Sequence, residues 1–587
     1  MNADRSGQYG SVRYQPDERP APAVTLGLAL QSSVLIIARI VVVPMFVVRA
    51  AGGTEAYLSW ALFATVSVCG LTTVLQAVRL GRIGSGYVAV MGTSLAVVGV
   101  AITAVAEGGP ALLATLTLVT AVVPLILSAR LALFRRVLTP TVSGTVIMLI
   151  PVTLMPSAFG LLEDVPSSTP PIAAPLVAIS TLAVIVVITL KGSATMRLWS
   201  PVVGVVAGSM VAAIFGLYDV DSIAGASWIG IPEAAWPGLD LDFGPLFWAL
   251  LPAFVLVSLI NSVQTISNAV GTQRVSWRRM RAVDYRAVQR TVATAGVGNV
   301  LCGLAATVPT TLLTTSVAVT GLTGAAARPV GIGVGVVFMA LALLPKALAV
   351  VLAIPGPVVA AYLVVLMATI LLLGMKMVLH DGIDHRHGLI VGVAFSLGVG
   401  FQYGAIFPEF ANDFAGGLLK SGVTAGGLVA IAMTVLMEIA NPRRSRIETV
   451  LDVSALPKIR EFIAAFASRG DWGESMVHRL EAAAEETVLT LSGVQEGVAA
   501  SGDRRLLLTA HRDDGGAVLE FLAASGEGNL QDRLALLAEE TGEVWVEREL
   551  SLRLLHHLAS SVRHEQYHDT DIVTVRVAPP VKSDRRP

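Results

Sequence analysis

The sequence predicts an α-helical polytopic membrane protein followed by a small cytosolic α/β domain. Hydrophobic residues make up 54% of the 587 residues and charged residues only 14%, whereas soluble domains carry roughly 25% charge. Long apolar stretches fill residues 24–440, and both ends of the chain are polar. The two halves of the apolar region also resemble each other in order and spacing, which indicates an internal repeat.

A membrane-spanning helix needs about 20 mostly apolar residues. The apolar region holds fourteen such segments, of which the third and the tenth are short and interrupted. We expect them near residues 24–48, 57–78, 84–105, 110–128, 137–159, 171–190, 198–217, 245–270, 288–305, 307–323, 330–352, 355–375, 387–402 and 420–440.

The loops predict which side faces the cytosol, because lysine and arginine accumulate on the cytoplasmic side. With residues 1–23 as a disordered cytosolic tail, the inside loops hold most of the basic residues, including Arg79, Arg130 and the cluster at 274–290. Acidic residues predominate in the outside loops. We therefore expect a multi-pass protein of the cytoplasmic (plasma) membrane with both termini in the cytosol.

The internal repeat predicts an inverted architecture. Val90-Met91-Gly92-Thr93 corresponds to Val308-Pro309-Thr310-Thr311, about 218 residues later, and two further pairs of motifs keep nearly the same offset. Fourteen segments in two copies give seven segments per copy. Because seven is odd, the second copy enters the membrane from the opposite side, which is the 7+7 inverted repeat of many carriers.

The third and tenth segments are interrupted at matching repeat positions. Residues 84–91 are β-prone and bounded by glycine, and Pro309 removes a backbone donor and disfavours helix before it. Non-helical backbone is tolerated in a bilayer only where protein buries it or where it lines a cavity. We therefore predict short strands and a binding site here, with half-helix N-termini near 92–94 and 311–315. Close helix packing by small residues is the alternative.

Several motifs within residues 24–440 resemble the nucleobase–ascorbate transporter family, which includes uracil, xanthine and urate permeases. Leu30-Gln31 followed by Pro44 is similar to the family's first helix, and Gly92-Thr93-Ser94 is similar to its third segment. Residues 344–358 resemble its loop and twelfth helix, and residues 419–430 resemble its last helix.

The resemblance implies a core domain of segments 1–4 and 8–11 and a gate domain of segments 5–7 and 12–14. It implies a secondary permease for a nucleobase-like solute, and not an enzyme, embedded in membrane lipid as a homodimer. No cofactor, metal site or nucleic-acid partner is expected. The substrate would lie between the short strands and contact Gln31, Ser32, Gly92, Thr93, Ser94, Asn261, Gln264, Thr265, Thr310, Thr311 and Leu312.

The chain departs from the family pattern at the positions that usually bind protons. Ser32 stands where the family has histidine, Asn261 where it has glutamate, and Leu312 near a glutamate or glutamine position. No acidic residue lies in 245–283 or 291–380. A buried carboxylate is the simplest proton carrier, so the family's usual proton coupling is doubtful here.

Amide and hydroxyl groups remain available for binding. Asn261, Gln264 and Asn268 are spaced to share one helix face. An amide both donates and accepts, which suits the edge of a nucleobase. The alternative is hydrogen bonding between helices, worth about 1 kcal/mol or less per bond.

Arg39 is a cation inside the first segment, where the family has a small residue. A charge within a span is costly and indicates a functional site by default. Arg39 precedes Pro44 by five residues, so it could instead reach outward to the membrane surface or form a structural pair. Contact with an anionic substrate is the other interpretation.

Residues 450–580, after a linker at 441–449, read as a separate cytosolic domain. Residues 456–466 have helical spacing, residues 506–522 read as a β-hairpin, and residues 572–577 alternate as a final strand. The domain resembles the histidine-kinase-type ATPase fold of anti-sigma-factor kinases. Thr490 stands at the position of the fold's magnesium-binding asparagine, and Ala524 stands at the position of the aspartate in its adenine box. The segment near 551–555, which resembles the phosphate-loop helix, lacks the glycine of that helix. A nucleotide-free regulatory domain that docks a cytosolic protein is therefore favoured.

Two other functions stay open. An anion carrier of the sulfate-permease type is favoured by Arg39 and the missing carboxylates, and opposed by Gln31 and the motif at 421–430. A membrane sensor or scaffold would bind a ligand without moving it and signal through the C-terminal domain.

Overall fold

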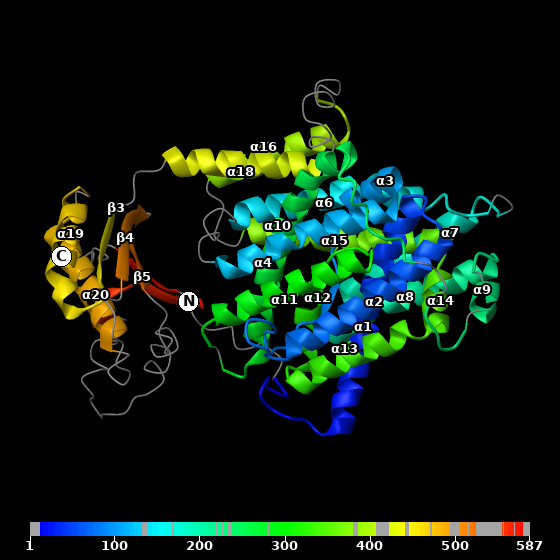
Figure 1. The fold of residues 1–587 in the computed structure, drawn as a ribbon, viewed down its shortest axis with the longest axis horizontal. Coiled ribbons are helices and arrows are strands. Elements are labelled where there is room, and N and C mark those ends of the chain that lie inside the picture. The colour runs from blue at the N-terminus through cyan, green and yellow to red at the C-terminus, as the bar shows by residue number, and fades with distance from the viewer. Residues whose placement is uncertain are drawn as a thin grey trace, which may run out of the picture. The chain divides into compact units, whose positions relative to one another are not determined.

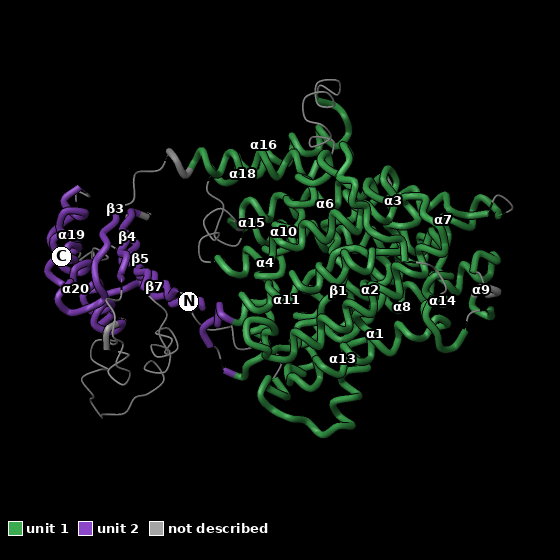
Figure 2. The backbone as a smooth tube through the Cα atoms, in the orientation of Figure 1, with its two compact units in different colours: residues 1–278, 287–439 green, residues 279–286, 440–587 purple. Residues whose placement is uncertain are grey.

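The structure is a computed structural model. It describes residues 12–131, 139–166, 169–218, 220–225, 227–232, 236–279, 281–379, 385–406, 422–440, 445–469, 472–493, 505–513, 516–523, 554–555, 557–568 and 570–578. The chain divides into two compact units (Figure 2): unit 1 comprises residues 1–278 and 287–439, and unit 2 comprises residues 279–286 and 440–587.

The chain up to residue 440 is mostly helical (Figure 1). The helices of its first half are α1 (Pro22–Ala50), α2 (Glu55–Ala77), α3 (Val98–Thr120), α4 (Val122–Ala129), α6 (Pro140–Gly160), α7 (Ala173–Lys191), α8 (Ala194–Ile214) and α9 (Val220–Gly225). Those of its second half are α10 (Pro245–Ser276), α11 (Tyr285–Leu304), α12 (Thr314–Thr323), α13 (Arg328–Ala342), α14 (Pro345–Leu352), α15 (Gly356–Leu379), α16 (His385–Gln402) and α18 (Gly422–Ala440).

Each of the fourteen expected segments coincides with a helix or a strand–helix element. Of the described helices, eight are long and apolar enough to cross a membrane, or nine if the bent pair α13 and α14 forms one span. α3 and α4 together count as one of these eight helices. Gly109 has a φ of 75° and interrupts α3 between residues 105 and 110, where the sequence predicts the boundary between the third and fourth segments. The count of fourteen and the inversion of the repeat stay predictions.

The strands expected in the third and tenth segments are present. β1 (Met91–Thr93) pairs antiparallel with β2 (Thr310–Leu312), and Gly92 lies opposite Thr311. Two bonds flank the pair, from the Ser94 amide to the Pro309 carbonyl and from the Leu313 amide to the Val90 carbonyl. These bonds satisfy backbone groups that a broken helix leaves open, which buried backbone requires.

Two groups of helices pack mainly within themselves. α2 crosses α13 at Gly70 and Gly335, and α6 crosses α15 at Gly144 and Gly374. At all four glycines an added Cβ would collide with backbone of the partner helix. Small residues therefore let these backbones approach closely. The first group also contains α1, α3, α10 and α12, and the second contains α7, α8 and α16. Naming these groups core and gate stays a prediction.

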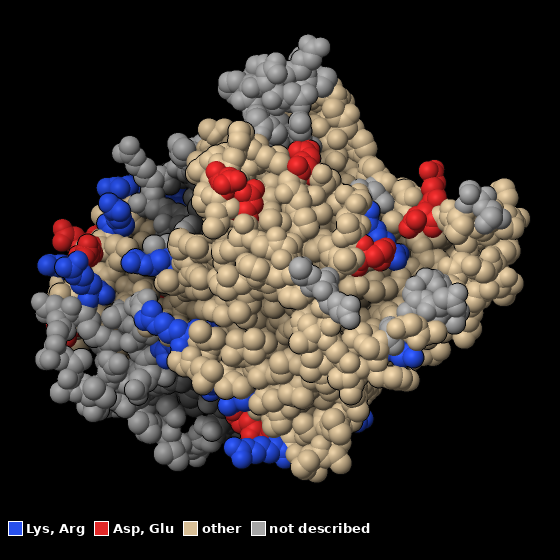
Figure 3. Space-filling view, turned by 45° about the vertical axis from the view of Figure 1, so that its right-hand side comes forward, with Lys and Arg blue, Asp and Glu red and all other residues tan. Residues whose placement is uncertain are grey.

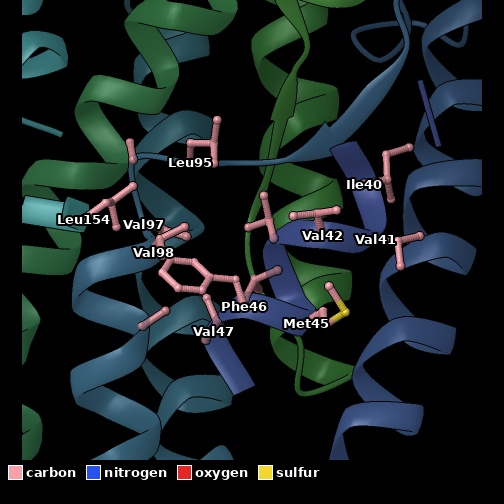
Figure 4. Packing of buried hydrophobic residues seen from close by; sticks show 14 of the residues in the cluster. Ile40, Val41, Val42, Met45, Phe46, Val47, Leu95, Val97, Val98 and Leu154 are labelled. Atoms are coloured by element: carbon pink, nitrogen blue, oxygen red, sulfur yellow. The ribbon is translucent and has the colours of Figure 1, made fainter. Parts of the chain in front are cut away.

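The centre of the first group is filled by the second half of α1. Met45 and Phe46 are almost completely buried and belong to one apolar cluster with Val97 and Val98 at the start of α3 (Figure 4). Helices that are apolar on all sides lie inside a protein or a membrane. By contrast α7 and α8 expose large apolar side chains such as Ile179 and Ile214, and Figure 3 shows a broad surface without charged side chains. Such a surface suits contact with lipid.

Residues 12–21 are ordered, contrary to the disordered tail expected for 1–23. Tyr14 forms a β-bridge with Ala325, Glu18 pairs with Arg278 at 2.6 Å, and Asp17 pairs with Arg328. The segment is thus tied to the ends of α10 and α13. Residues 1–11 lie outside the described residues.

Unit 2 contains an antiparallel five-stranded sheet in the order β3-β4-β5-β7-β6. The strands are β3 (Ser445–Val450), β4 (Arg505–Asp513), β5 (Gly516–Ala523), β6 (Ser561–Gln566) and β7 (Asp571–Val577), and the helices are α19 (Leu456–Ser468) and α20 (Glu474–Gly493). The short element η1 (Val453–Ala455) precedes α19. One apolar core joins both helices to the sheet.

The structure corrects the expected start of this domain. β3 occupies most of the expected linker at 441–449, and unit 2 resumes at Ala440 rather than at residue 450. The expected helix, hairpin and final strand are confirmed in α19, β4–β5 and β7. The adenine-box residues 524–528 and residues 551–553 lie outside the described residues, so the ATPase resemblance stays a prediction.

Candidate functional site

The β1–β2 pair gathers polar side chains from four elements of the membrane unit. The Thr93 hydroxyl donates to the Arg39 carbonyl of α1 at 3.1 Å. The Ser94 hydroxyl donates to Oδ1 of Asn261 on α10 at 2.5 Å. These side chains are buried, so an apolar interior surrounds a small polar cluster. The breaks expected in the third and tenth segments therefore lie side by side, and they contact both α1 and α10.

Strand alternation separates two threonines that the sequence assigns to one site. The Thr311 and Thr265 hydroxyls lie 3.0 Å apart, so Thr311 faces α10. Thr310 faces α11, where its amide and hydroxyl both donate to Oδ1 of Asn299, at 2.8 and 3.2 Å. Neighbouring strand residues point to opposite sides. Thr310 thus holds β2 against α11 and does not share the Thr311 side.

The three amides of α10 have different surroundings. Asn268 is fully engaged, because Nδ2 donates to the Leu312 carbonyl at 2.6 Å and Oδ1 accepts from Thr314 at 3.2 Å. Gln264 is half-buried, and its amide forms no hydrogen bond within the described part of the chain. Asn261 uses its oxygen for Ser94. The two amide groups left for a ligand are therefore those of Gln264 and the Nδ2 group of Asn261.

Arg39 lies at the strand pair and not at a membrane surface. Its Nη1 donates to the Thr315 hydroxyl in the first turn of α12, at 3.1 Å. Its Nε is buried and has no hydrogen-bond partner among the described residues. Tyr362 of α15 lies within electrostatic range of the guanidinium. The contact with Thr315 favours the pairing interpretation of Arg39 over outward reach, and contact with an anionic substrate stays a prediction.

Gln31 and Ser32 are not drawn into this cluster by any hydrogen bond among the described residues. Ser32 is buried on α1, seven residues before Arg39, which is about 10 Å along the helix. Gly92 and Leu312 contribute backbone: Gly92 packs against Leu313, and the Leu312 carbonyl accepts from Asn268. Their expected roles as substrate contacts stay predictions.

Three neighbours of the site were missed from the sequence. Asn299 lies in the expected segment 288–305, to which the sequence assigns no site residue, and Thr315 lies in the half-helix start expected at 311–315 but is not among the expected contacts. Tyr362 is the only polar aromatic in the apolar run of α15, which is the one signal that could have found it. Their roles follow from contacts across the fold, at separations in sequence that no local pattern reveals.

A cavity of about 1240 Å³ opens between the two helix groups, ten residues along α1 from Arg39. It is lined by Arg49 of α1, Leu62 of α2, Asp164 after α6 and Leu348 of α14, among others. Arg49 donates to the Leu352 carbonyl at 2.8 Å. The cavity lies about 15 Å from Arg39 along the helix, and its lining does not include the residues of the strand pair.

Comparison with known proteins finds relatives of the membrane unit. The sequence model of the xanthine/uracil permease family matches residues 24–406. The xanthine permease XanP of Escherichia coli K12 is 27% identical over 451 residues, covering 73% of this chain and 95% of XanP. The uric acid permease PucK of Bacillus subtilis is 25% identical over 438 residues, covering 72% of this chain and 97% of PucK.

Among solved structures, the murine anion transporter Slc26a9 in its inward-facing state resembles the chain with a TM-score of 0.50 at 14% identity. The match covers 74% of this chain and 71% of that one. At this identity the likeness concerns the fold alone. The family match spans most of the membrane unit, including the strand pair and Arg39. The chain therefore belongs to the xanthine/uracil permease family of nucleobase–ascorbate transporters.

Proposed function

We propose that the protein is a secondary permease that carries a nucleobase-like solute of the uracil, xanthine or urate class. Its family is one of transporters rather than enzymes, and the relatives above are named for xanthine and uric acid. The observation that carries the proposal is the polar cluster at β1–β2, where Ser94, Asn261 and Thr311 meet in an apolar interior.

The chemistry of this cluster suits a flat heterocycle with mixed donors and acceptors. Nδ2 of Asn261 donates, and the free amide of Gln264 both donates and accepts. The two half-helices that begin beyond β1 and β2 add the positive ends of their dipoles. Tyr362 of the second helix group interacts electrostatically with Arg39, and movement of the two helix groups against each other would carry a bound ring across the membrane.

We further propose that this transport does not depend on a proton. In the segments 245–283 and 291–380, which include β2, α12, α13 and α15, no carboxylate is available as a carrier. Both termini in the cytosol, a homodimer and a regulatory role of unit 2 toward a cytosolic protein belong to the same proposal.

The test is uptake by the purified full-length protein in proteoliposomes. Labelled uracil, xanthine, urate and sulfate are supplied with and without a pH gradient. Nucleobase uptake that ignores the gradient supports the proposal, and uptake that requires the gradient refutes its proton independence. Uptake of sulfate alone would support the anion carrier that Arg39 favours. Tight binding of a base without uptake would support a sensor.

A further inference from the structure

We propose that Arg39 binds the negative charge of the solute, so that the carried species is a heterocyclic monoanion of the urate type rather than a neutral base. This inference rests on the proposed permease function and names the substrate class of the same site. It concerns Arg39, whose guanidinium is hydrogen-bonded to Thr315 beside the strand pair.

The first support is the charge balance around the site. Among the described residues, Arg39 is the one lysine, arginine, aspartate or glutamate whose side chain is hydrogen-bonded to the first turn of α12, and none of these residue types is hydrogen-bonded through its side chain to the strand pair. No aspartate or glutamate occurs in residues 19–54 or 56–106, which include all of α1 and β1 and all of α2 except Glu55. None occurs in 245–283 or 291–380 either. The positive charge at the centre of this unit therefore has no acidic partner in these segments.

The second support is the hydrogen bonding of the guanidinium. Arginine offers five N–H groups in a planar fork. Thr315 accepts one bond from Nη1 and fixes the orientation of the fork. Nε is buried without a partner among the described residues. A buried donor without a partner is costly, so the site as described is incomplete and favours an acceptor beside Arg39.

The chemistry of the neighbouring groups favours a heterocyclic anion over an inorganic one. A deprotonated ring offers an oxygen and a nitrogen side by side, which matches the paired donors of arginine. Its remaining ring N–H groups can donate to the free carbonyl oxygen of Gln264, which lies one helical turn from Asn261. Sulfate has only acceptors and would leave that carbonyl unmatched.

The experiment compares solutes that differ in charge. Binding and uptake of urate, xanthine, uracil and sulfate are measured in proteoliposomes of the full chain, over a pH range in which xanthine loses a proton and uracil does not. We expect wild-type affinity for xanthine to rise with pH as the anion forms, while affinity for uracil stays constant. Xanthine affinity that falls or stays constant with pH would overturn the inference without any variant.

Variants test whether the preference for an anionic solute comes from Arg39. We expect Arg39→Gln to lose at least tenfold in urate affinity and to keep uracil affinity within about threefold, with Arg39→Lys in between. Arg82→Gln, which removes an exposed loop charge, is the matched control. Thr315→Val removes the hydroxyl that orients the guanidinium and should weaken urate binding less than Arg39→Gln does. It tests the same contact if Arg39→Gln does not fold. Unchanged urate affinity in both site variants would refute the assignment.

The outcomes separate this inference from the proposed function. If the wild type carries neutral bases but not urate, the permease stands and the anion assignment fails. If sulfate displaces urate and is itself carried, the site takes inorganic anions and the heterocyclic assignment fails. If no base is carried, the proposed function itself fails.

Discussion

Nη1 of Arg39 donates a hydrogen bond to the hydroxyl of Thr315, 3.1 Å away, and so joins the middle of α1 to the first turn of α12. The two residues are 276 positions apart in the chain, yet they flank the same strand pair. No aspartate or glutamate in the surrounding segments balances this cation, so if Arg39 belongs to the solute site, that site is positively charged before the solute binds. This arrangement has consequences for the transport cycle.

Exchange of anions should be faster than net uptake. With a monoanion bound, the site is neutral, whereas the empty site must move a bare cation through a region of low dielectric constant, which is costly. We expect efflux of labelled urate from proteoliposomes to accelerate at least tenfold when unlabelled urate is added outside. In Arg39→Gln the acceleration should disappear. Equal efflux with and without outside urate in the wild type would contradict this charge argument.

Replacing Asn261 by glutamate should make transport depend on protons. Oδ1 of Asn261 already lies 2.5 Å from the Ser94 hydroxyl, so a carboxylate there would sit beside the strand pair. A carboxylate that gains and loses a proton during the cycle couples the solute to the proton gradient. We expect urate uptake to fall, since a negative charge at the site repels an anionic solute, and uptake of uracil to respond to an imposed pH gradient. Asn261→Gln keeps the amide and is the control. Gradient-independent uptake by the glutamate variant would contradict the prediction.

Gln264 and Asn268 should separate binding from stability. Asn268 holds β2 with two hydrogen bonds, so Asn268→Ala should lower the free energy of unfolding by about 1–2 kcal/mol and lower the melting temperature. Gln264 forms no hydrogen bond among the described residues, so Gln264→Ala should leave the melting temperature unchanged and weaken solute binding by roughly tenfold. Thermal unfolding and binding isotherms of both variants provide the measurement. A lower melting temperature for Gln264→Ala alone would reverse the two assignments.

The crossing of α2 and α13 should not tolerate a methyl group. A Cβ at Gly335 would lie 2.5 Å from the Gly70 carbonyl oxygen, so Gly335→Ala must push the two helices apart. We expect a loss of about 1–3 kcal/mol in the free energy of unfolding, measured by thermal or denaturant unfolding in detergent. Gly99→Ala, whose nearest neighbour would be a Thr153 hydroxyl 3.8 Å away, is the control and should be neutral or stabilising. Equal stability of the two variants would contradict the close-contact argument.

The elements of the fold could be located from the sequence because each depends on a local pattern. The interruption at Pro309 follows from a missing backbone donor, and it coincides with β2. The hairpin around residues 513–516 follows from alternation and turn residues, and it is confirmed as β4–β5. The start of unit 2 was misplaced because β3 is a polar edge strand, and its pairing with β4 is what defines it as a strand.

The site residues were harder to assign, since each role depends on what lies across the fold. Thr310 and Thr311 are adjacent and chemically identical, but strand alternation sends one to Asn299 and the other to Thr265. Asn261 and Asn268 share a helix face, yet only Asn268 has both its amide groups engaged. A helical wheel shows which face a side chain shares, and only the packed neighbours show whether its donors are already used.

The sequence alone determined the membrane class, the two interrupted segments, the family and the missing carboxylates. Each of these depends on a short stretch of sequence: on its apolar length, on residues that break a helix, or on the identity of single residues. The tertiary structure alone decided where Arg39 lies. A charge in an apolar helix can be satisfied at the membrane surface or inside the protein, and its sequence neighbours are the same in both cases. The contact with Thr315, and the buried Nε beside it, place this charge at the strand pair.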